Sequence, residues 1–125
     1  MTNPSVSKDV YSTRKGKVAI VYATDYLNKN SGEKVEYECQ RHLSSGYKGL
    51  VISFRETKIV NSIGVSILLG IIESAKNSGS QVVFSEANQQ TISLFEMLGL
   101  TKHVKVAVDE NEALRVATDE EKSLG

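Results

Sequence analysis

The stretch that decides the fold reads Lys58-Ile59-Val60-Asn61-Ser62-Ile63-Gly64-Val65, where we expect a strand to run through a short polar turn into an apolar helix. Apolar residues recur at helical spacing beyond the turn and predict a helix over residues 62–77, with a core face of Ile67, Leu68, Ile71, Ile72 and Ala75. We expect Ser62 to cap this helix by accepting hydrogen bonds from its free N–H groups. A phosphate on Ser62 would lie at the positive end of the helix dipole, which makes Ser62 the candidate phosphorylation site.

Strand and helix patterns alternate on both sides of this stretch. Strands are expected over residues 6–14, 17–23, 49–54, 81–84 and 104–108, with a turn at Lys15-Gly16 between the first two. A helix is expected over residues 33–43, after a polar loop over residues 24–32. Two further helices should begin after the caps Asn88 and Asp109, and the first of them should bury Ile92, Phe95 and Leu98.

This order of elements predicts an α/β fold. We expect a mostly parallel sheet of four to five strands, opened by an antiparallel hairpin, with about four helices packed on it. At 125 residues, the chain is expected to form a single domain over residues 1–125, with a core over about residues 8–117 and a polar tail over residues 118–125.

Composition argues against several classes of partner. Fifteen basic and fifteen acidic residues cancel, so the chain lacks the positive field that nucleic-acid binding requires. The longest apolar run, residues 63–72, is too short to insert through a bilayer. The first residues have no apolar signal-peptide core, and a single cysteine, Cys39, cannot form an internal disulfide. We therefore expect a cytoplasmic protein.

The sequence contains no arrangement of residues typical of an active site. His42 and His103 are far apart, with no cysteine or acidic cluster at metal-ligand spacing. Cys39 falls on the core-facing stripe of a helix, as expected for a small buried side chain. Lys15-Gly16-Lys17 lacks the other glycines of a phosphate-binding loop. We expect no enzyme activity, no metal site and no cofactor.

The chain resembles the STAS domain, the fold of bacterial anti-sigma factor antagonists, from about residue 8 to residue 117. The family's central motif runs hydrophobic, Asp, Ser, Ser or Thr, Gly and then an apolar helix, and it is matched by residues 60–70. Residues 75–84 look like the family's helix end, glycine and next strand. Residues 94–100 look like its short helix with a closing Leu-Gly-Leu, and residues 109–114 are similar to the acidic start of its final helix.

The resemblance implies a partner-switching function. In the family, the serine at the position of Ser62 is phosphorylated by a partner that is both a serine kinase and an anti-sigma factor. The unphosphorylated domain captures this kinase and frees a sigma factor, phosphorylation releases the kinase, and a serine phosphatase resets the domain. The implied partner-binding residues are Asn61, Ser62, Gly64 and Asp25, and ATP would be bound by the kinase rather than by this chain.

The motif departs from the family pattern, and alternatives stay open. Asn61 stands where the family has aspartate, Ile63 replaces the second hydroxyl residue, and Asp25 follows the second strand without the usual preceding glycine. One alternative is a STAS scaffold that is not phosphorylated and assembles into a homo-oligomer. The other is a soluble accessory subunit of a membrane transporter.

Overall fold

A five-stranded sheet lies at the centre of the fold. The structure, a computed structural model, describes residues 9–118. The sheet has the order β1-β2-β4-β6-β7, with β1 at Tyr11–Lys15, β2 at Val18–Tyr22, β4 at Gly49–Ser53, β6 at Gln81–Ser85 and β7 at Lys105–Ala107. β1 runs antiparallel to β2, and the other neighbours are parallel. The predicted sheet and its opening hairpin are therefore confirmed.

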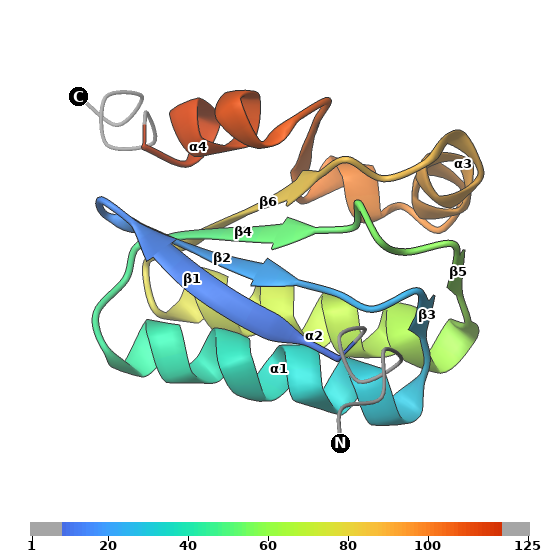
Figure 1. Ribbon diagram of the computed structural model, residues 1–125, viewed down its shortest axis with the longest axis horizontal. Coiled ribbons are helices and arrows are strands. Elements are labelled where there is room, and N and C mark those ends of the chain that lie inside the picture. The colour runs from blue at the N-terminus through green and yellow to red at the C-terminus, as the bar shows by residue number, and fades with distance from the viewer. Residues whose placement is uncertain (1–8, 119–125) are drawn as a thin grey trace, which may run out of the picture.

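Helices cover both faces of this sheet, as Figure 1 shows. α1 (Lys29–Ser44) and α2 (Ser62–Asn77) lie side by side on one face, and α4 (Glu110–Thr118) lies on the other. α3 (Gln89–Met97) and the short 3-10 helix η2 (Leu100–Lys102) add Phe95 and Leu100 to the core on the α1–α2 side. β2 and β4 are buried along their whole length because helices cover both of their faces.

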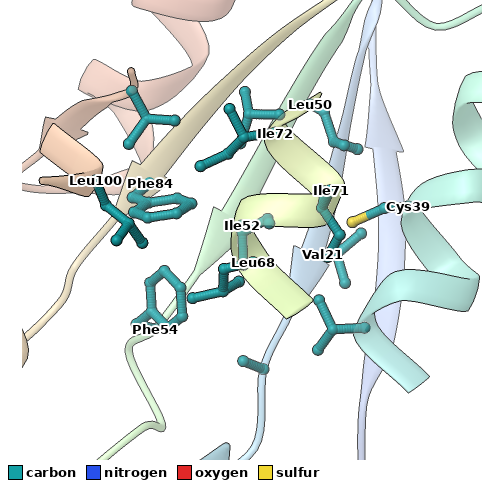
Figure 2. Close-up of a cluster of buried hydrophobic side chains, with 14 of the residues drawn as sticks. Val21, Cys39, Leu50, Ile52, Phe54, Leu68, Ile71, Ile72, Phe84 and Leu100 are labelled. Atoms are coloured by element: carbon teal, nitrogen blue, oxygen red, sulfur yellow. The ribbon is translucent and has the colours of Figure 1, made fainter. Parts of the chain in front are cut away.

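The main core lies between the sheet and the α1–α2 layer (Figure 2). Leu68 and Ile71 of α2 and Cys39 of α1 are fully buried there against Leu50 and Ile52 of β4. Burying one large apolar side chain contributes about 1.5–3 kcal/mol. At one end of this core the rings of Phe54, Phe84 and Phe95 pack with centroids 5.0–5.5 Å apart.

The helix after the central motif has the expected bounds, Ser62–Asn77. Its predicted core residues Leu68, Ile71, Ile72 and Ala75 are buried. Ile67 is only partly buried, since its side chain lies against Gly32 of α1 instead of the sheet. The caps expected at Asn88 and Asp109 are also confirmed, because their side chains accept hydrogen bonds from the N–H groups of Thr91 and Glu112.

The segment expected to be a polar loop is more ordered than the sequence indicates. It contains a two-residue strand, β3 (Tyr26–Leu27), which pairs in parallel with β5 (Ile59–Val60) as a second small sheet. α1 begins at Lys29 rather than at residue 33, because Asn28 and Ser31 form a capping box that starts the helix one turn earlier.

Two smaller predictions are wrong. The hairpin turn is formed by Gly16 and Lys17, and Lys15 belongs to β1, where it pairs with Val18. Of the three residues expected to be buried in α3, Phe95 makes the core contact, Ile92 is only partly buried, and Leu98 is 49% exposed because the helix ends at Met97. The predicted tail beyond residue 118, and residues 6–8 of the first predicted strand, lie outside the described residues. Within residues 9–118, no helix has the length and apolar character needed to cross a membrane.

Candidate functional site

Asn61 rather than Ser62 caps α2. The Asn61 side-chain oxygen accepts a hydrogen bond from the N–H of Gly64 at 2.8 Å, and its backbone is extended, with φ −92° and ψ 175°. The Asn61 carbonyl accepts the next helical bond, from the N–H of Val65, at 3.0 Å. The prediction that Ser62 is the cap is therefore wrong, since the short asparagine side chain one residue earlier satisfies the free N–H group.

Ser62 is the first residue of α2 and is exposed. Within the described residues its hydroxyl takes part in no hydrogen bond. The first turn of α2 carries no acidic side chain. A negatively charged group on Ser62 would meet the positive end of the helix dipole without repulsion from that turn.

Gly64 is buried because α2 begins against β3. A Cβ atom on Gly64 would lie 2.6 Å from the carbonyl oxygen of Leu27, which is closer than side chains tolerate. The same carbonyl accepts a hydrogen bond from the N–H of Asn61 at 3.0 Å. The interpretation of Gly64 as a close-packing residue is thus confirmed. The assignment of Gly64 to the partner-binding surface stays a prediction. Because Gly64 is buried, it would affect partner binding through the position of the backbone at the start of α2.

Asp25 lies beside the segment that leads into Ser62. Its carbonyl accepts hydrogen bonds from the N–H groups of Lys58, at 2.7 Å, and Ile59, at 3.2 Å, while its carboxylate is exposed. The next residues continue this contact as the β3–β5 pairing. The structure therefore brings all four predicted partner-binding residues to one end of α2, with Asp25 held there by its backbone.

Three exposed apolar side chains surround the start of α2. Tyr26 and Ile59 face each other across the β3–β5 pair and are 45% and 61% exposed, and Ile63 is 49% exposed. The Tyr26 hydroxyl lies 3.4 Å from the Asn61 side-chain amide, which donates to it. We call Tyr26, Ile59, Ser62 and Ile63 the docking face. Contiguous exposed apolar patches mark surfaces that contact other proteins, whereas single exposed apolar residues are common on protein surfaces.

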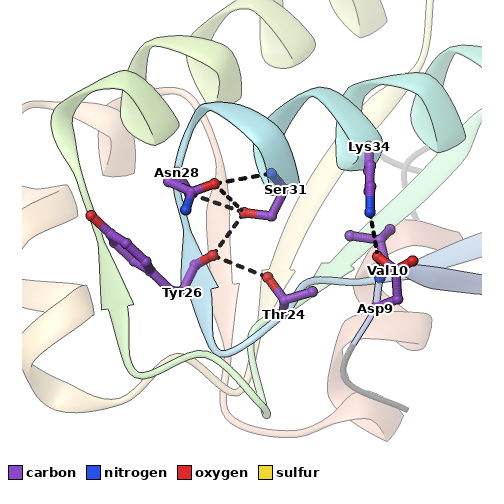
Figure 3. Close-up of polar contacts among 7 residues, drawn as sticks. All are labelled: Asp9, Val10, Thr24, Tyr26, Asn28, Ser31 and Lys34. Atoms are coloured by element: carbon purple, nitrogen blue, oxygen red, sulfur yellow. Dashed lines mark hydrogen bonds and ion pairs between the residues drawn. The ribbon is translucent and has the colours of Figure 1, made fainter. Parts of the chain in front are cut away.

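The start of α1 fixes the backbone of Tyr26, a residue of the docking face. Figure 3 shows the Tyr26 carbonyl accepting hydrogen bonds from the hydroxyls of Ser31, at 2.7 Å, and Thr24, at 3.1 Å. Asn28 and Ser31 bond each other reciprocally at the cap of α1. β3 is thus fixed to α1 through Tyr26 and to α2 through Leu27, so the docking face rests on two helix starts.

Other reactive side chains are used by the fold. Cys39 is fully buried, and burial raises the pKa of its thiol, which makes it a poor nucleophile. His42 is buried and bonded to Arg14 and Ser12. Across residues 9–118, His, Cys, Asp and Glu form no cluster of three or more that could hold a metal ion.

A family model described as the STAS domain matches residues 10–113. The chain belongs to the STAS domain family. The match includes β1 through the start of α4 and contains the whole docking face.

Solved structures share the fold. A serine-to-glutamate variant of RsbS from Moorella thermoacetica is 17% identical with a TM-score of 0.78, covering 90% of this chain and 97% of that chain. The Bacillus cell fate determinant SpoIIAA in its phosphorylated form is 15% identical with a TM-score of 0.67, covering 86% and 98%. A sulfate transporter family protein from Wolinella succinogenes is 15% identical with a TM-score of 0.67, covering 85% and 88%. At these identities the likeness shows the STAS fold. Anti-sigma factor antagonists such as SpoIIAA have this fold.

Tyr26 and Ile59 are residues of the docking face that the sequence did not reveal. Each lies in a two-residue strand, which is too short to produce a periodic pattern. Their one sequence signal is that each directly precedes a buried apolar residue, Leu27 or Val60, as expected for strand residues on opposite faces.

Proposed function

We propose that this STAS protein is a partner-switching regulator, an anti-sigma factor antagonist that binds a serine kinase/anti-sigma factor through the docking face. In the unphosphorylated state the docking face holds the kinase, and a sigma factor is free to direct transcription. The kinase, which binds the ATP, transfers the γ-phosphoryl group to Ser62, and ADP leaves. A serine phosphatase restores the hydroxyl. The setting is the bacterial cytoplasm.

One observation carries this proposal: Ser62 is exposed at a helix start, its hydroxyl makes no hydrogen bond within the described residues, and exposed apolar side chains lie on the elements that meet there. A residue that the fold does not use can be modified without unfolding the domain. The apolar side chains Tyr26, Ile59 and Ile63 supply contact area that a protein partner can bury. A hydroxyl beside these contacts lies where a modification would change binding.

The physical effect of phosphorylation would be local. A phosphate adds about −1.5 to −2 charges and three acceptor oxygens. The dipole of α2 stabilises this charge in the free domain. In a complex, by contrast, the charge would have to be desolvated against the partner and beside the apolar groups of the docking face. Phosphorylation would therefore weaken the complex more than it disturbs the free domain.

The remaining predicted site residues position Ser62 for this role. Asn61 fixes the first turn of α2 through its cap bond to Gly64. Gly64 lets that turn approach Leu27, and the Asp25 carbonyl holds the segment before it. Asn61 also leaves Ser62 without a carboxylate at the preceding residue, so a phosphate would meet less local repulsion than in a chain with aspartate there.

Two structural neighbours support the proposal and a third supports an alternative. SpoIIAA exists in a phosphorylated form, and an RsbS variant carries glutamate in place of a serine. The Wolinella neighbour belongs to a sulfate transporter family. The second candidate is therefore an accessory subunit of a membrane transporter, which would copurify with a transport protein rather than with a serine kinase.

A phosphotransfer experiment tests the proposal. Purified chain is incubated with radiolabelled ATP and extract of the native host, and the label is mapped by mass spectrometry. We expect label on wild type and none on Ser62→Ala. Ser66→Ala is the matched control, because Ser66 is exposed on α2 one turn further on. Label that persists on Ser62→Ala, or that is lost only from Ser66→Ala, would contradict the assignment of Ser62.

A further inference from the structure

We propose that the free edge of β1 pairs with β1 of a second copy of this chain, joining two sheets into one. β1 has a single neighbour among the described strands, β2. Lys15 and Val18 flank a two-residue turn, and such flanking residues bond each other in a hairpin. Bonding alternates along an antiparallel pair, so Tyr11, Thr13 and Lys15 bond to β2.

The intervening residues of β1, Ser12 and Arg14, therefore direct their backbone groups away from the sheet. The hydrogen bonding of β2 agrees with this alternation. Val18, Ile20 and Tyr22 bond to β1, so the residues between them should bond to β4 on the opposite side of β2. Ala23, which continues this alternation directly after β2, does donate its N–H to the Ser53 carbonyl, at 3.0 Å. Unpaired N–H and C=O groups along a strand edge are a template for another strand.

The opposite edge of the sheet is partly closed. On β7, the N–H of Val108 donates to a Glu112 carboxylate oxygen at 2.7 Å, and the N–H of Val104 donates to the Leu100 carbonyl at 3.2 Å. The end of η2 and the start of α4 thus use two of the N–H groups that a new strand on β7 would need. Of the two edges in the described sheet, β1 is the longer, with five residues against three for β7.

Charge selects the register of the pair. A two-fold antiparallel pair centred on Ser12 places Asp9 opposite Lys15 of the second copy, and by symmetry Lys15 opposite Asp9 of that copy. Opposite charges directly across an antiparallel pair are stabilising. Centring the pair on Arg14 would instead place two Arg14 side chains opposite each other. Within one chain Lys15 pairs with Glu110 at 2.6 Å and Asp9 pairs with Lys34 at 3.0 Å, but the side chains of Lys15 and Asp9 are 53% and 55% exposed. Exposed ion pairs of this kind contribute little to stability, so both side chains can take a new partner. The Ser12-centred register therefore gives two attractive contacts where the alternative gives a repulsive one.

The surroundings of the edge suit a second copy. A hollow of about 500 Å³ lies beside Val10 on the α1 side, with Glu33, Glu38 and the 66%-exposed Tyr37 among its lining residues. Lys34 also lines this hollow, and Glu38 already accepts a hydrogen bond from Arg41 at 2.7 Å. In the Ser12-centred register, Arg14 of the second copy lies opposite Val10 and therefore beside Glu33 and Glu38. The chain has a formal net charge of zero at pH 7, so two copies approach without long-range repulsion.

Sedimentation equilibrium of the full chain and four variants tests this inference. We expect a wild-type dimer, at least tenfold weaker association in Asp9→Lys and in Lys15→Asp, and recovery of the dimer in the double variant that exchanges the two charges. Lys17→Asp is the matched control for charge, because Lys17 is exposed in the turn and outside the paired register. It should associate like wild type.

Amide hydrogen exchange gives a second readout. It distinguishes loss of β1 pairing from a variant that only lowers the stability of the monomer. The amides of Ser12 and Arg14 should gain protection as protein concentration rises, whereas that of Thr13 is already bonded within the monomer. A monomeric wild type at high concentration, single variants that dimerise normally, or no concentration-dependent protection at Ser12 would each overturn the inference. None of the docking-face residues lies in β1, so these outcomes are independent of the proposed kinase switch.

Discussion

Gly64 and Leu27 approach so closely that a single methyl group on Gly64 would lie 2.6 Å from the Leu27 carbonyl oxygen. This approach fixes the start of α2 against β3. The same carbonyl accepts the N–H of Asn61, the residue before Ser62. The position of the candidate phosphorylation site therefore depends on a glycine that is itself hidden from any partner.

Substituting Gly64→Ala should destabilise the domain. The new Cβ would contact a backbone carbonyl, which cannot move as a flexible side chain can, and overpacking of this kind costs about 1–3 kcal/mol. Gly70→Ala, on the same helix, is the control, because a Cβ there meets no atom within 4 Å. It should stabilise by about 0.5–1 kcal/mol. Urea unfolding of both variants checks this, and equal effects would refute the close-packing explanation.

The capping assignment predicts different costs at two adjacent residues. Asn61→Ala removes the acceptor of the Gly64 N–H and should cost about 1 kcal/mol. Asn61→Asp keeps that acceptor and adds a charge worth about 0.3–1 kcal/mol at the helix start. Ser62→Ala should stay within about 0.5 kcal/mol of wild type. Thermal unfolding distinguishes these cases. A loss of stability in Ser62→Ala as large as that in Asn61→Ala would restore Ser62 as the cap.

The docking face should matter for binding and not for stability. Ile59→Ser and Ile63→Ser each remove an exposed apolar side chain, so each should leave the free energy of unfolding within about 0.5 kcal/mol of wild type. Each should weaken binding of the captured kinase by more than about 1 kcal/mol, roughly fivefold. Met97→Ser, at a 78%-exposed residue of α3, is the control. Isothermal titration calorimetry checks this. Equal affinities of all three variants for the kinase would place the interface elsewhere.

His42 should make stability depend on pH near neutrality. Burial first, and then the charges of Arg41 and Arg14, lower the pKa of His42. Arg14 also donates a hydrogen bond to His42 Nδ1 at 3.1 Å, which requires that nitrogen to be unprotonated. Ser12 bonds the other ring nitrogen, and Glu38, 4.0 Å away, is the one nearby group that opposes the shift.

The sign of the effect follows from proton uptake. The unfolded chain binds a proton at His42 near pH 6.5, but the folded chain binds it only at lower pH. The stability contributed by neutral His42 is therefore complete above about pH 6.5 and is lost as the pH falls through the folded pKa. His42→Gln should flatten this part of the stability profile. Urea midpoints measured across this range check the slope, and an unchanged slope in His42→Gln would contradict the assignment.

Much of the fold could be predicted because its main elements carry strong patterns. The apolar spacing after Ser62 gave α2 its bounds, and continuous apolar runs marked β2 and β4. β5 is the strand expected directly before α2, and it is confirmed. β3 was missed because two residues cannot show a period, and its pairing with β5 joins segments more than thirty residues apart. The start of α1 was missed because Asn28 and Ser31 look like loop residues until their side chains are seen to bond each other.

The candidate site was predicted in part for a similar reason. Its motif placed Ser62 at the start of a helix, but sequence alone could not decide between two adjacent residues that are both good caps. Nor could it show that Gly64 is buried, because that depends on how closely Leu27 approaches. The exposed contact surface is the part that the sequence conceals most, since Tyr26 and Ile59 are apolar residues that would ordinarily be assigned to a core.

The affinity of the captured kinase for this chain with and without a phosphate on Ser62 is the most direct test of the account. The measurement compares purified unphosphorylated chain with the Ser62-phosphorylated form, using Ser66→Asp to control for added charge on the same helix. The account predicts binding at least tenfold weaker, about 1.4 kcal/mol, for the phosphorylated form alone. Equal or tighter binding by the phosphorylated form would contradict it.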